Sequence, residues 1–386
     1  MRGPGILFFI IIIVIMLVVT ALFSKILDYI CIVKYRKLIR KICLVLNGMS
    51  MAGLFVGKWL LSDWVFAGVL LRLLSMWFML QVLMIGVVFL IVFLRFACRK
   101  LKGTNVSLDK ERRRMLKHAV AFPVAAMGVT AYGSFYESDH IEDTQNGIYI
   151  EGMDRSMEGY CIAQLSDVHL GYFFSVEKLR DVLDRIAAKK PDVLVVTGDL
   201  FDDRSQNDIA AKLLDTYTDK FPQGIYFCRG NHEHMRGIEA IEAALQKTAV
   251  HELVNKNVIL KEGCPALYLA GVEYPMDREN HEQLCRMYMA EAFQKIPENS
   301  VTILLAHHPD FIDNGADHNV NLVLTGHTHG GQFGLLGIPL MPMFKYMRGM
   351  YQKGSSYGYV NRGAGSWFPV RFGCPPEIAY FTLRKK

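Results

Sequence analysis

Residues 321–332 read NLVLTGHTHGGQ, so that a short apolar run leads directly into two histidines set among glycines. Four other apolar runs of the chain end in the same manner. Residues 160–166 lead to Asp167-Val168-His169, 192–197 to Gly198-Asp199, 224–229 to Gly230-Asn231-His232-Glu233, and 301–306 to His307-His308-Pro309. Each motif alone is common by chance, but five in this order, each at a strand end, predict one shared site.

These five runs belong to a longer alternation of strand-like and helix-like segments. Further strands are expected at 266–272, 358–361 and 377–382, and helical patterns lie at 176–190, 208–220, 238–247 and 282–296. Strands that alternate with helices predict an α/β layered fold. Because ligands bind beyond the carboxyl ends of the strands in such folds, we expect the five polar loops to converge on one crevice.

Charge divides the chain into two parts. Residues 1–136 carry a net charge of +14 and long apolar runs, whereas residues 137–386 carry −8. The basic residues flank the apolar runs and do not line a soluble face, so nucleic acid is not expected as a specific partner. Residues 137–158 are polar and lack periodicity, which predicts a linker into a domain that spans 159–386.

The N-terminal part contains four apolar segments, near 6–23, 42–61, 73–94 and 119–136. The first is uncharged throughout its 18 residues, and a helix needs about 20 such residues to cross a hydrocarbon core. The fourth is short and interrupted by Pro123, Gly128 and Gly133. We therefore expect an all-α transmembrane region of about four helices, with the lipid bilayer as a partner.

The basic loops predict the orientation of these helices. Loop 24–41 has six basic residues against one acidic residue, and loop 95–117 has nine against two. Such loops face the cytoplasm, so four spans predict a multi-pass protein of the cell membrane whose C-terminal domain lies outside the cytoplasm. If the fourth segment does not span, the domain is cytoplasmic.

The order DxH, GD, GNHE, H and GHTH resembles that of the calcineurin-like metallophosphoesterase superfamily. Residues 326–332 (GHTHGGQ) and 359–378 (YVNRGAGSWFPVRFGCPPEI) are similar to its membrane-associated bacterial branch, the YkuE/YaeI-like phosphodiesterases. The resemblance covers residues 159–386. It implies a four-layer αββα sandwich with a two-metal centre.

The resemblance also implies a role for each motif residue. One metal ion would be bound by Asp167, His169, Asp199 and His329, and the second by Asp199, Asn231, His307 and His327. His232 would be the catalytic acid at the leaving oxygen, and Asn231 and His232 would contact the substrate. The family often has aspartate where this chain has Glu233. Of His307 and His308, the family pattern His-x-Pro selects His307.

The residue types suit this chemistry. A pair of divalent ions can clamp a phosphate ester and acidify a bridging water, so that a bridging hydroxide attacks the phosphorus atom. Oxygen ligands mixed with imidazoles favour Mn²⁺, Fe or Zn²⁺ over Ca²⁺, with Mg²⁺ as a further candidate. A neutral imidazole that is not needed as a ligand, such as that of His232, can act as a general acid.

An apolar stretch follows the last metal motif. Residues 333–351 contain Leu335, Leu336, Ile338, Leu340, Met341, Met343, Phe344, Met347 and Met350. One interpretation is packing on the domain or against the membrane helices. The other is a hydrophobic lip that admits a lipid-bearing substrate.

These observations predict a membrane-anchored dinuclear-metal phosphohydrolase, foremost a phosphodiesterase whose phosphate-ester substrates include lipid-linked ones. One alternative is a UDP-2,3-diacylglucosamine pyrophosphatase of lipid A synthesis, which requires a cytoplasmic domain. The other is a non-catalytic membrane sensor with a hydrolase fold. The complete set of ligand residues argues against the sensor.

Overall fold

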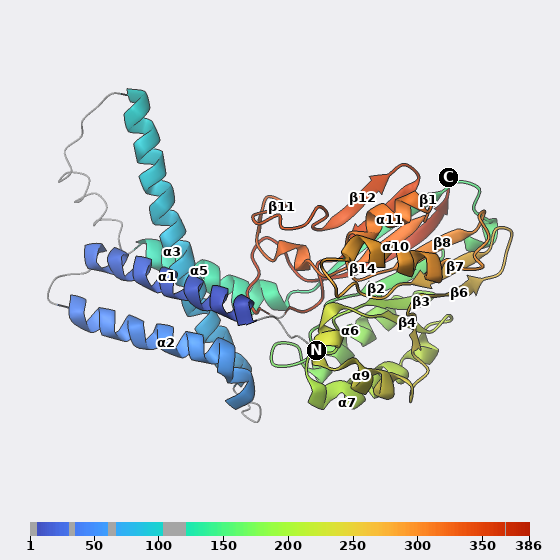
Figure 1. The fold of residues 1–386 in the computed structure, drawn as a ribbon, viewed down its shortest axis with the longest axis horizontal. Coiled ribbons are helices and arrows are strands. Elements are labelled where there is room, and N and C mark those ends of the chain that lie inside the picture. The colour runs from blue at the N-terminus through green and yellow to red at the C-terminus, as the bar shows by residue number, and fades with distance from the viewer. Residues whose placement is uncertain (1–5, 31–34, 61–66, 103–120, 367) are drawn as a thin grey trace. The chain divides into compact units, whose positions relative to one another are not determined.

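A computed structural model describes residues 6–30, 35–60, 67–102, 121–366 and 368–386 (Figure 1). The chain divides into two compact units. Met1–Tyr136 with Phe368–Val370 form the first, and Glu137–Trp367 with Arg371–Lys386 form the second. Each unit has apolar cores of its own.

The N-terminal unit is helical. Its helices are α1 (Ile6–Ile30), α2 (Arg36–Leu60), α3 (Ala67–Lys102) and α5 (Ala121–Ala131), and a π-helix at Tyr132–Tyr136 continues α5. A buried polar cluster joins the first three helices. Oδ1 of Asn47 accepts hydrogen bonds from Trp77 (2.6 Å) and Gln81 (2.7 Å), and its Nδ2 donates to Thr20 (3.0 Å). Hydrogen bonds of this kind hold apolar helices in a defined register.

The prediction of four membrane spans is not confirmed. Within the described residues, Gly68–Phe89 of α3 is the one stretch that is long and apolar enough to cross a membrane, and Ile13–Lys25 of α1 is a shorter apolar stretch. Helix α5 has 11 residues and is only about 16 Å long. Residues 119–120 of the fourth predicted segment, and 103–117 of the second basic loop, lie outside the described residues.

The second unit contains two six-stranded sheets. The first has the order β1-β14-β2-β3-β4-β5, and β2 to β5 run parallel. Its strands are β1 (Glu142–Ile150), β14 (Glu377–Lys385), β2 (Cys161–Leu165), β3 (Val193–Thr197), β4 (Ile225–Cys228) and β5 (His251–Glu252). The α/β fold expected from the alternating pattern is therefore present.

The second sheet has the order β12-β13-β9-β8-β7-β6. Its strands are β12 (Gly349–Lys353), β13 (Ser356–Val360), β9 (Leu322–Thr325), β8 (Val301–Leu305), β7 (Leu267–Gly271) and β6 (Lys256–Lys261). A separate two-stranded hairpin, β10 (Gly334–Leu335) and β11 (Ile338–Pro339), precedes β12.

Side chains that alternate along each strand build three cores between four layers. In β3, Val193 and Val195 join a core that both sheets share, whereas Leu194 and Val196 pack with the helices of the first sheet. Those helices are α6 (Val176–Ala188), α7 (Asn207–Asp215) and α9 (Ile238–Leu245). Helices α10 (His281–Ala292) and α11 (Phe311–Asp317) cover the second sheet. Successive residues of a strand point to opposite faces of its sheet. Because another layer covers each face, both faces are apolar.

The interpretation of residues 137–158 as a linker is wrong. They contain β1, which pairs parallel with β14 over nine residues at the edge of the first sheet. Most side chains of β1 are exposed or half-buried, and only Ile148 and Ile150 enter the core. An edge strand with so little buried surface lacks the apolar alternation that identifies strands in a sequence.

Candidate metal centre

The five polar loops lie at the carboxyl ends of five strands. Strands β2, β3 and β4 of the first sheet and β8 and β9 of the second each end one or two residues before a motif. The two sheets face each other across their shared core, so their loops meet at one edge. This is the edge at which α/β sheets bind ligands.

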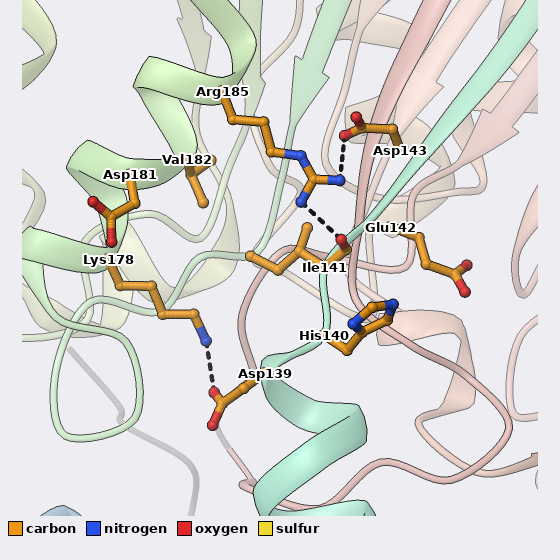
Figure 2. A pocket seen from close by; sticks show the side chains of 9 residues that line it. All are labelled: Asp139, His140, Ile141, Glu142, Asp143, Lys178, Asp181, Val182 and Arg185. Carbon is orange, nitrogen blue, oxygen red and sulfur yellow. Dashed lines mark hydrogen bonds and ion pairs between the residues drawn. The ribbon is translucent and has the colours of Figure 1, made fainter.

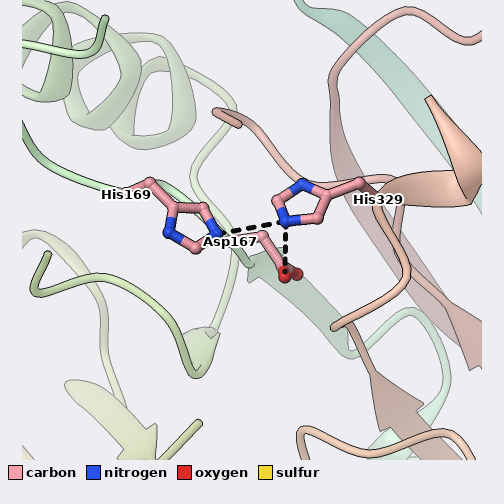
Figure 3. Close-up of side chains that lie close together, drawn as sticks. All are labelled: Asp167, His169 and His329. Atoms are coloured by element: carbon pink, nitrogen blue, oxygen red, sulfur yellow. Dashed lines mark hydrogen bonds and ion pairs between the residues drawn. The ribbon is translucent and has the colours of Figure 1, made fainter. Parts of the chain in front are cut away.

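Asp167, His169 and His329 form the first cluster of potential ligands (Figure 3). The Nε2 atoms of the two histidines are 3.1 Å apart, and Nε2 of His329 lies 3.6 Å from Oδ1 of Asp167. All three side chains are buried. Figure 3 shows the three side chains pointing toward one another from two separate loops.

Asp199 connects this cluster to a second one. Its Oδ2 lies 3.7 Å from Nε2 of His169 and 3.2 Å from Nε2 of His307. Nε2 of His307 in turn lies 3.2 Å from Nδ1 of His327. Asp199, His307 and His327 therefore form a second group of potential ligands, and Asp199 stands between the two groups.

The backbone of these ligands is strained. Asp167, His169, Asp199, His327 and His329 all have positive φ angles, between 50° and 73°. Residues other than glycine rarely adopt this conformation, although aspartate, asparagine and histidine tolerate it best. Several such residues at one place are typical of a functional site whose geometry the surrounding fold enforces.

Two glycines allow the ligand loops to pack this closely. A Cβ atom at Gly230 would lie 2.2 Å from Oδ1 of Asp199, and one at Gly326 would lie 2.2 Å from Oδ2 of Asp167. No side chain fits at either position unless these neighbours move, and they include the backbone nitrogen of Asp199 beside Gly230 and Oγ of Ser166 beside Gly326. The glycines of the GNHE and GHTH motifs are therefore part of the site.

The donor atoms fit divalent metal ions. Asn231 begins helix α8 (Asn231–Arg236), and its buried Oδ1 has no hydrogen-bond partner within the described part of the chain. A buried amide oxygen left without a partner is costly unless it binds a ligand. Nδ1 of His307 donates to the carbonyl of Thr197 (2.7 Å), which leaves Nε2 free to bind a metal ion. The site contains oxygen and imidazole donors, which suit a dinuclear centre of divalent ions.

His307 and His308 have different surroundings. His307 contacts Asp199, whereas Nδ1 of His308 lies 3.5 Å from Oδ2 of Asp310, which also contacts His281 (3.1 Å). His308 therefore belongs to a separate group with His281 and Asp310, outside the two clusters at Asp199.

The carboxylate of Asp199 is charged in this environment. Burial alone raises its pKa, but the imidazoles of His307 and His232 outweigh burial, and the pKa lies well below its usual range. Burial lowers the pKa of His307, yet Asp199 and Asp167 raise it to about 10. Burial and neighbouring imidazoles hold the pKa values of His327 and His329 well below their usual range. These two histidines are therefore neutral, as metal ligands must be, whereas His307 must lose a proton from Nε2 when a metal ion binds.

His232 forms a third group of potential ligands with His169 and Asp199, and it is held by Asp202. Nδ1 of His232 is 2.9 Å from Oδ1 of Asp202, which also accepts a hydrogen bond from Nε of Arg236 (2.5 Å). Burial lowers the pKa of His232, but Asp199 and Asp202 outweigh it and raise the pKa above its ordinary value. The rings of His232 and His169 are 4.4 Å apart. The surroundings of His232 thus favour its protonated form, which can act as an acid, over the neutral imidazole expected from the sequence.

Glu233 organises the loop that carries Asp199. Its buried carboxylate accepts four backbone N–H hydrogen bonds of 2.8–3.0 Å, from Asp199, Leu200, Phe201 and Gly230. The sequence predicted no role for this residue. Its place in the GNHE motif was the available signal, but four main-chain partners cannot be read from residue spacing.

The sequence predicted no role for two further residues near the ligands. Arg371 is completely buried and donates to carbonyl oxygens of Gly365 (2.7 Å) and Cys374 (3.0 Å), and its Nη1 lies 3.4 Å from the carbonyl of His329. Tyr274 follows β7, and its ring lies 5.6–5.7 Å from those of His307 and His327. The available signal for Tyr274 was its position just after a strand end, where the ligand residues also lie.

A pocket of about 620 Å³ lies away from this centre (Figure 2). It is formed by η2 (Glu137–Asp139), β1 and α6. Its two basic side chains are already paired, Lys178 with Asp139 (2.7 Å) and Arg185 with Asp143 (3.0 Å). None of the predicted site residues lines this pocket.

Comparison with known proteins agrees with this geometry. The family model for calcineurin-like phosphoesterases matches residues 161–331. The uncharacterized metallophosphoesterase YkuE of Bacillus subtilis is 34% identical over 290 residues, which cover 72% of this chain and 99% of YkuE. An uncharacterized metallophosphoesterase of Helicobacter pylori is 31% identical, with 74% of this chain and 77% of that protein covered.

A cattle protein named "Transmembrane protein with metallophosphoesterase domain" is 29% identical over 72% of this chain and 65% of its own length. The match to the family model, residues 161–331, includes all five motifs of the centre described above. The chain therefore belongs to the calcineurin-like metallophosphoesterase family, whose members are metal-dependent phosphoester hydrolases with a dinuclear centre.

Proposed function

We propose that this chain is a membrane-anchored phosphodiesterase with a dinuclear metal centre. The observation that carries the proposal is the position of Asp199. Its carboxylate stands between two groups of ligands, and its Oδ1 accepts a hydrogen bond from the backbone N–H of His232 (2.8 Å). One residue thus connects both candidate metal positions with the candidate acid.

The ligand residues would divide between two ions. Asp167, His169, Asp199 and His329 would hold one, and Asp199, Asn231, His307 and His327 would hold the other. When bound, two such ions polarise a phosphate ester and lower the pKa of a water molecule. The assignment follows the two clusters, with Asn231 added because its buried Oδ1 lacks another partner.

His232 would supply the proton that the leaving oxygen needs. Asp202 binds Nδ1, so Nε2 is the nitrogen left to face a substrate. Asp199 and Asp202 raise the pKa of His232 and so favour the protonated imidazole, the form that can donate this proton. A positioned acid of this kind accelerates departure of an alkoxide by about 10²–10⁴-fold. Asn231, the neighbouring residue, would contact the phosphate together with His232.

The preference for diesters rests on the resemblance of residues 326–332 and 359–378 to the phosphodiesterase branch of the family. Membrane anchoring rests on the apolar stretch Gly68–Phe89 and on relatives whose names include "transmembrane protein". With four spans, the basic loops would place the catalytic domain outside the cytoplasm.

One observation favours a second candidate. The described helical run from Ala121 to Tyr136 has 16 residues and is about 24 Å long, which is shorter than a hydrocarbon core of about 30 Å. If this run does not span, the domain is cytoplasmic. A cytoplasmic domain would suit the UDP-2,3-diacylglucosamine pyrophosphatase alternative, so a reporter fused after Lys386 separates the two by its location.

The proposal is tested with the full-length protein in detergent, loaded with Mn²⁺. We expect turnover of bis-p-nitrophenyl phosphate that exceeds turnover of p-nitrophenyl phosphate and disappears in Asp199→Asn. Turnover of the monoester alone would overturn the diester preference. Two bound metal ions without hydrolysis of either ester would favour the pyrophosphatase.

A further inference from the structure

The hairpin after the metal loop is apolar and exposed. It begins two residues after Gln332, at Gly334, and its strands β10 and β11 are joined by Leu336 and Gly337. Leu336 at its tip is 93% exposed. Five more apolar side chains in and after the hairpin are at least half exposed: Leu335, Ile338, Leu340, Met341 and Met343. Soluble surfaces seldom gather so many exposed apolar side chains without a partner.

The tip residue is also strained. Leu336 has a φ of 50° and Gly337 a φ of 83°. Two-residue hairpin loops with positive φ at both positions normally carry asparagine, aspartate or glycine at the first position. A leucine there opposes the backbone conformation and also exposes its side chain to water. Within the described part of the chain almost nothing covers this side chain, so it is accessible to a partner.

The segment that contains the hairpin contacts the loop of the metal centre. The backbone N–H of Gly334 donates to the carbonyl of Phe372 (2.7 Å), and Oγ1 of Thr328 donates to the carbonyl of Met347 (2.5 Å). The ring of Phe344 lies 5.2 Å from that of His327. Met347, unlike the tip residues, is buried. One end of the apolar segment therefore packs beside the ligands while the other end projects from the surface.

The composition of the segment indicates a lipid surface as the partner. Residues 333–353 contain Lys345, Arg348 and Lys353 but no acidic residue, and Lys345 (2.7 Å) and Lys353 (3.1 Å) share Asp313 of α11 as an ion-pair partner, so that the basic charge there exceeds the acidic charge. Apolar side chains flanked by basic ones are typical of segments that lie in the interface of a bilayer with anionic lipids. The chain also carries its own apolar stretch at Gly68–Phe89, which would keep a bilayer within reach.

We infer that residues 334–343 insert into the acyl-chain boundary of the membrane and so bring the metal centre to the phosphates of membrane lipids. This inference rests on the proposed phosphodiesterase function. It gives the substrate a class, namely a phosphodiester of a lipid that remains in the bilayer.

The decisive variant is Leu336→Asn. Asparagine tolerates the positive φ better than leucine does, so the variant should melt at the same temperature as the wild type or above it. Ile209→Asn is the matched control, because Ile209 on α7 is also more than half exposed. Both are made in the full-length protein and reconstituted in vesicles of phosphatidylcholine and phosphatidylglycerol.

Two readouts separate the inference from the proposed function. The first is the ratio of turnover rates for hexadecyl and ethyl p-nitrophenyl phosphate, which share the bond that breaks. Loss of one inserted leucine should lower this ratio by about tenfold, and Ile209→Asn should not change it. The second is photo-crosslinking from benzoylphenylalanine at position 336 or 209, which should give lipid adducts from 336 only.

Two results would overturn the inference and leave the phosphodiesterase intact. The first is an unchanged ratio together with crosslinks from position 336 to a second protein chain. The second is an unchanged ratio without lipid adducts from position 336. Lipid adducts without hydrolysis of either ester would support the membrane contact and contradict the phosphodiesterase.

Discussion

Oδ1 of Asp202 lies 2.9 Å from Nδ1 of His232, and this contact fixes the imidazole of the candidate acid. Asp202 is buried, and its second oxygen lies 3.7 Å from Nδ1 of His169. Burial raises the pKa of Asp202, but the neighbouring imidazoles of His169 and His232 outweigh burial and hold the pKa well below its usual range. Asp202 therefore stays anionic and stabilises a protonated His232.

Replacement of this charge should move the pH dependence of the reaction. In Asp202→Asn, one of the groups that raise the pKa of His232 is neutral, so His232 loses its proton at a lower pH. We expect the alkaline limb of kcat/KM against pH to shift to lower pH. Asp203→Asn is the control, because Asp203 caps η4 (Arg204–Gln206) and asparagine caps equally well. An identical shift in both variants would contradict the role of Asp202.

Removal of the imidazole itself should separate catalysis from metal binding. In His232→Asn we expect kcat to fall about 10²–10⁴-fold while the metal content stays that of the wild type. His234→Asn, on the same helix, removes a histidine that contacts Glu273 (2.9 Å) and should retain most of the activity. If His232→Asn loses metal in proportion to activity, His232 is a ligand and not the acid.

Glu233 should matter for stability more than for chemistry. In Glu233→Gln, an amide replaces the carboxylate that accepts hydrogen bonds from four backbone N–H groups. The amide NH2 group cannot accept a hydrogen bond, so at least one backbone N–H group loses its acceptor. We expect the free energy of unfolding to fall by about 3 kcal/mol, measured by urea denaturation in the presence of a chelator. The exposed Glu239 gives a matched control, Glu239→Gln, that should change stability by less than about 1 kcal/mol. Equal effects would show that the four hydrogen bonds contribute little.

The sequence predicted the central strands because their pattern is simple. Each of β2, β3, β4, β8 and β9 is buried on nearly every residue and ends at a motif, so apolar runs and polar loops coincide. Edge strands lack that signal. β1 was interpreted as linker, and β12 was missed because its residues are half-buried or exposed.

The sequence predicted which loops meet at the site but not the contacts that support the ligands. The clusters around Asp199 bring together residues from five separate loops, as the strand ends suggested. The supporting contacts were not predictable, because they depend on three-dimensional neighbours. Asp202 stands beside His232, and Arg371 beside the carbonyl of His329, over separations of 30 and 42 residues.

The most direct test of the two-metal centre is the metal content of the full-length protein, measured by plasma mass spectrometry after Mn²⁺ loading and removal of free ions. The position of Asp199 between both clusters predicts two ions per chain in the wild type and at most one in Asp199→Asn. One ion per chain in the wild type, or two in Asp199→Asn, would contradict a bridging role of Asp199 between two metal ions.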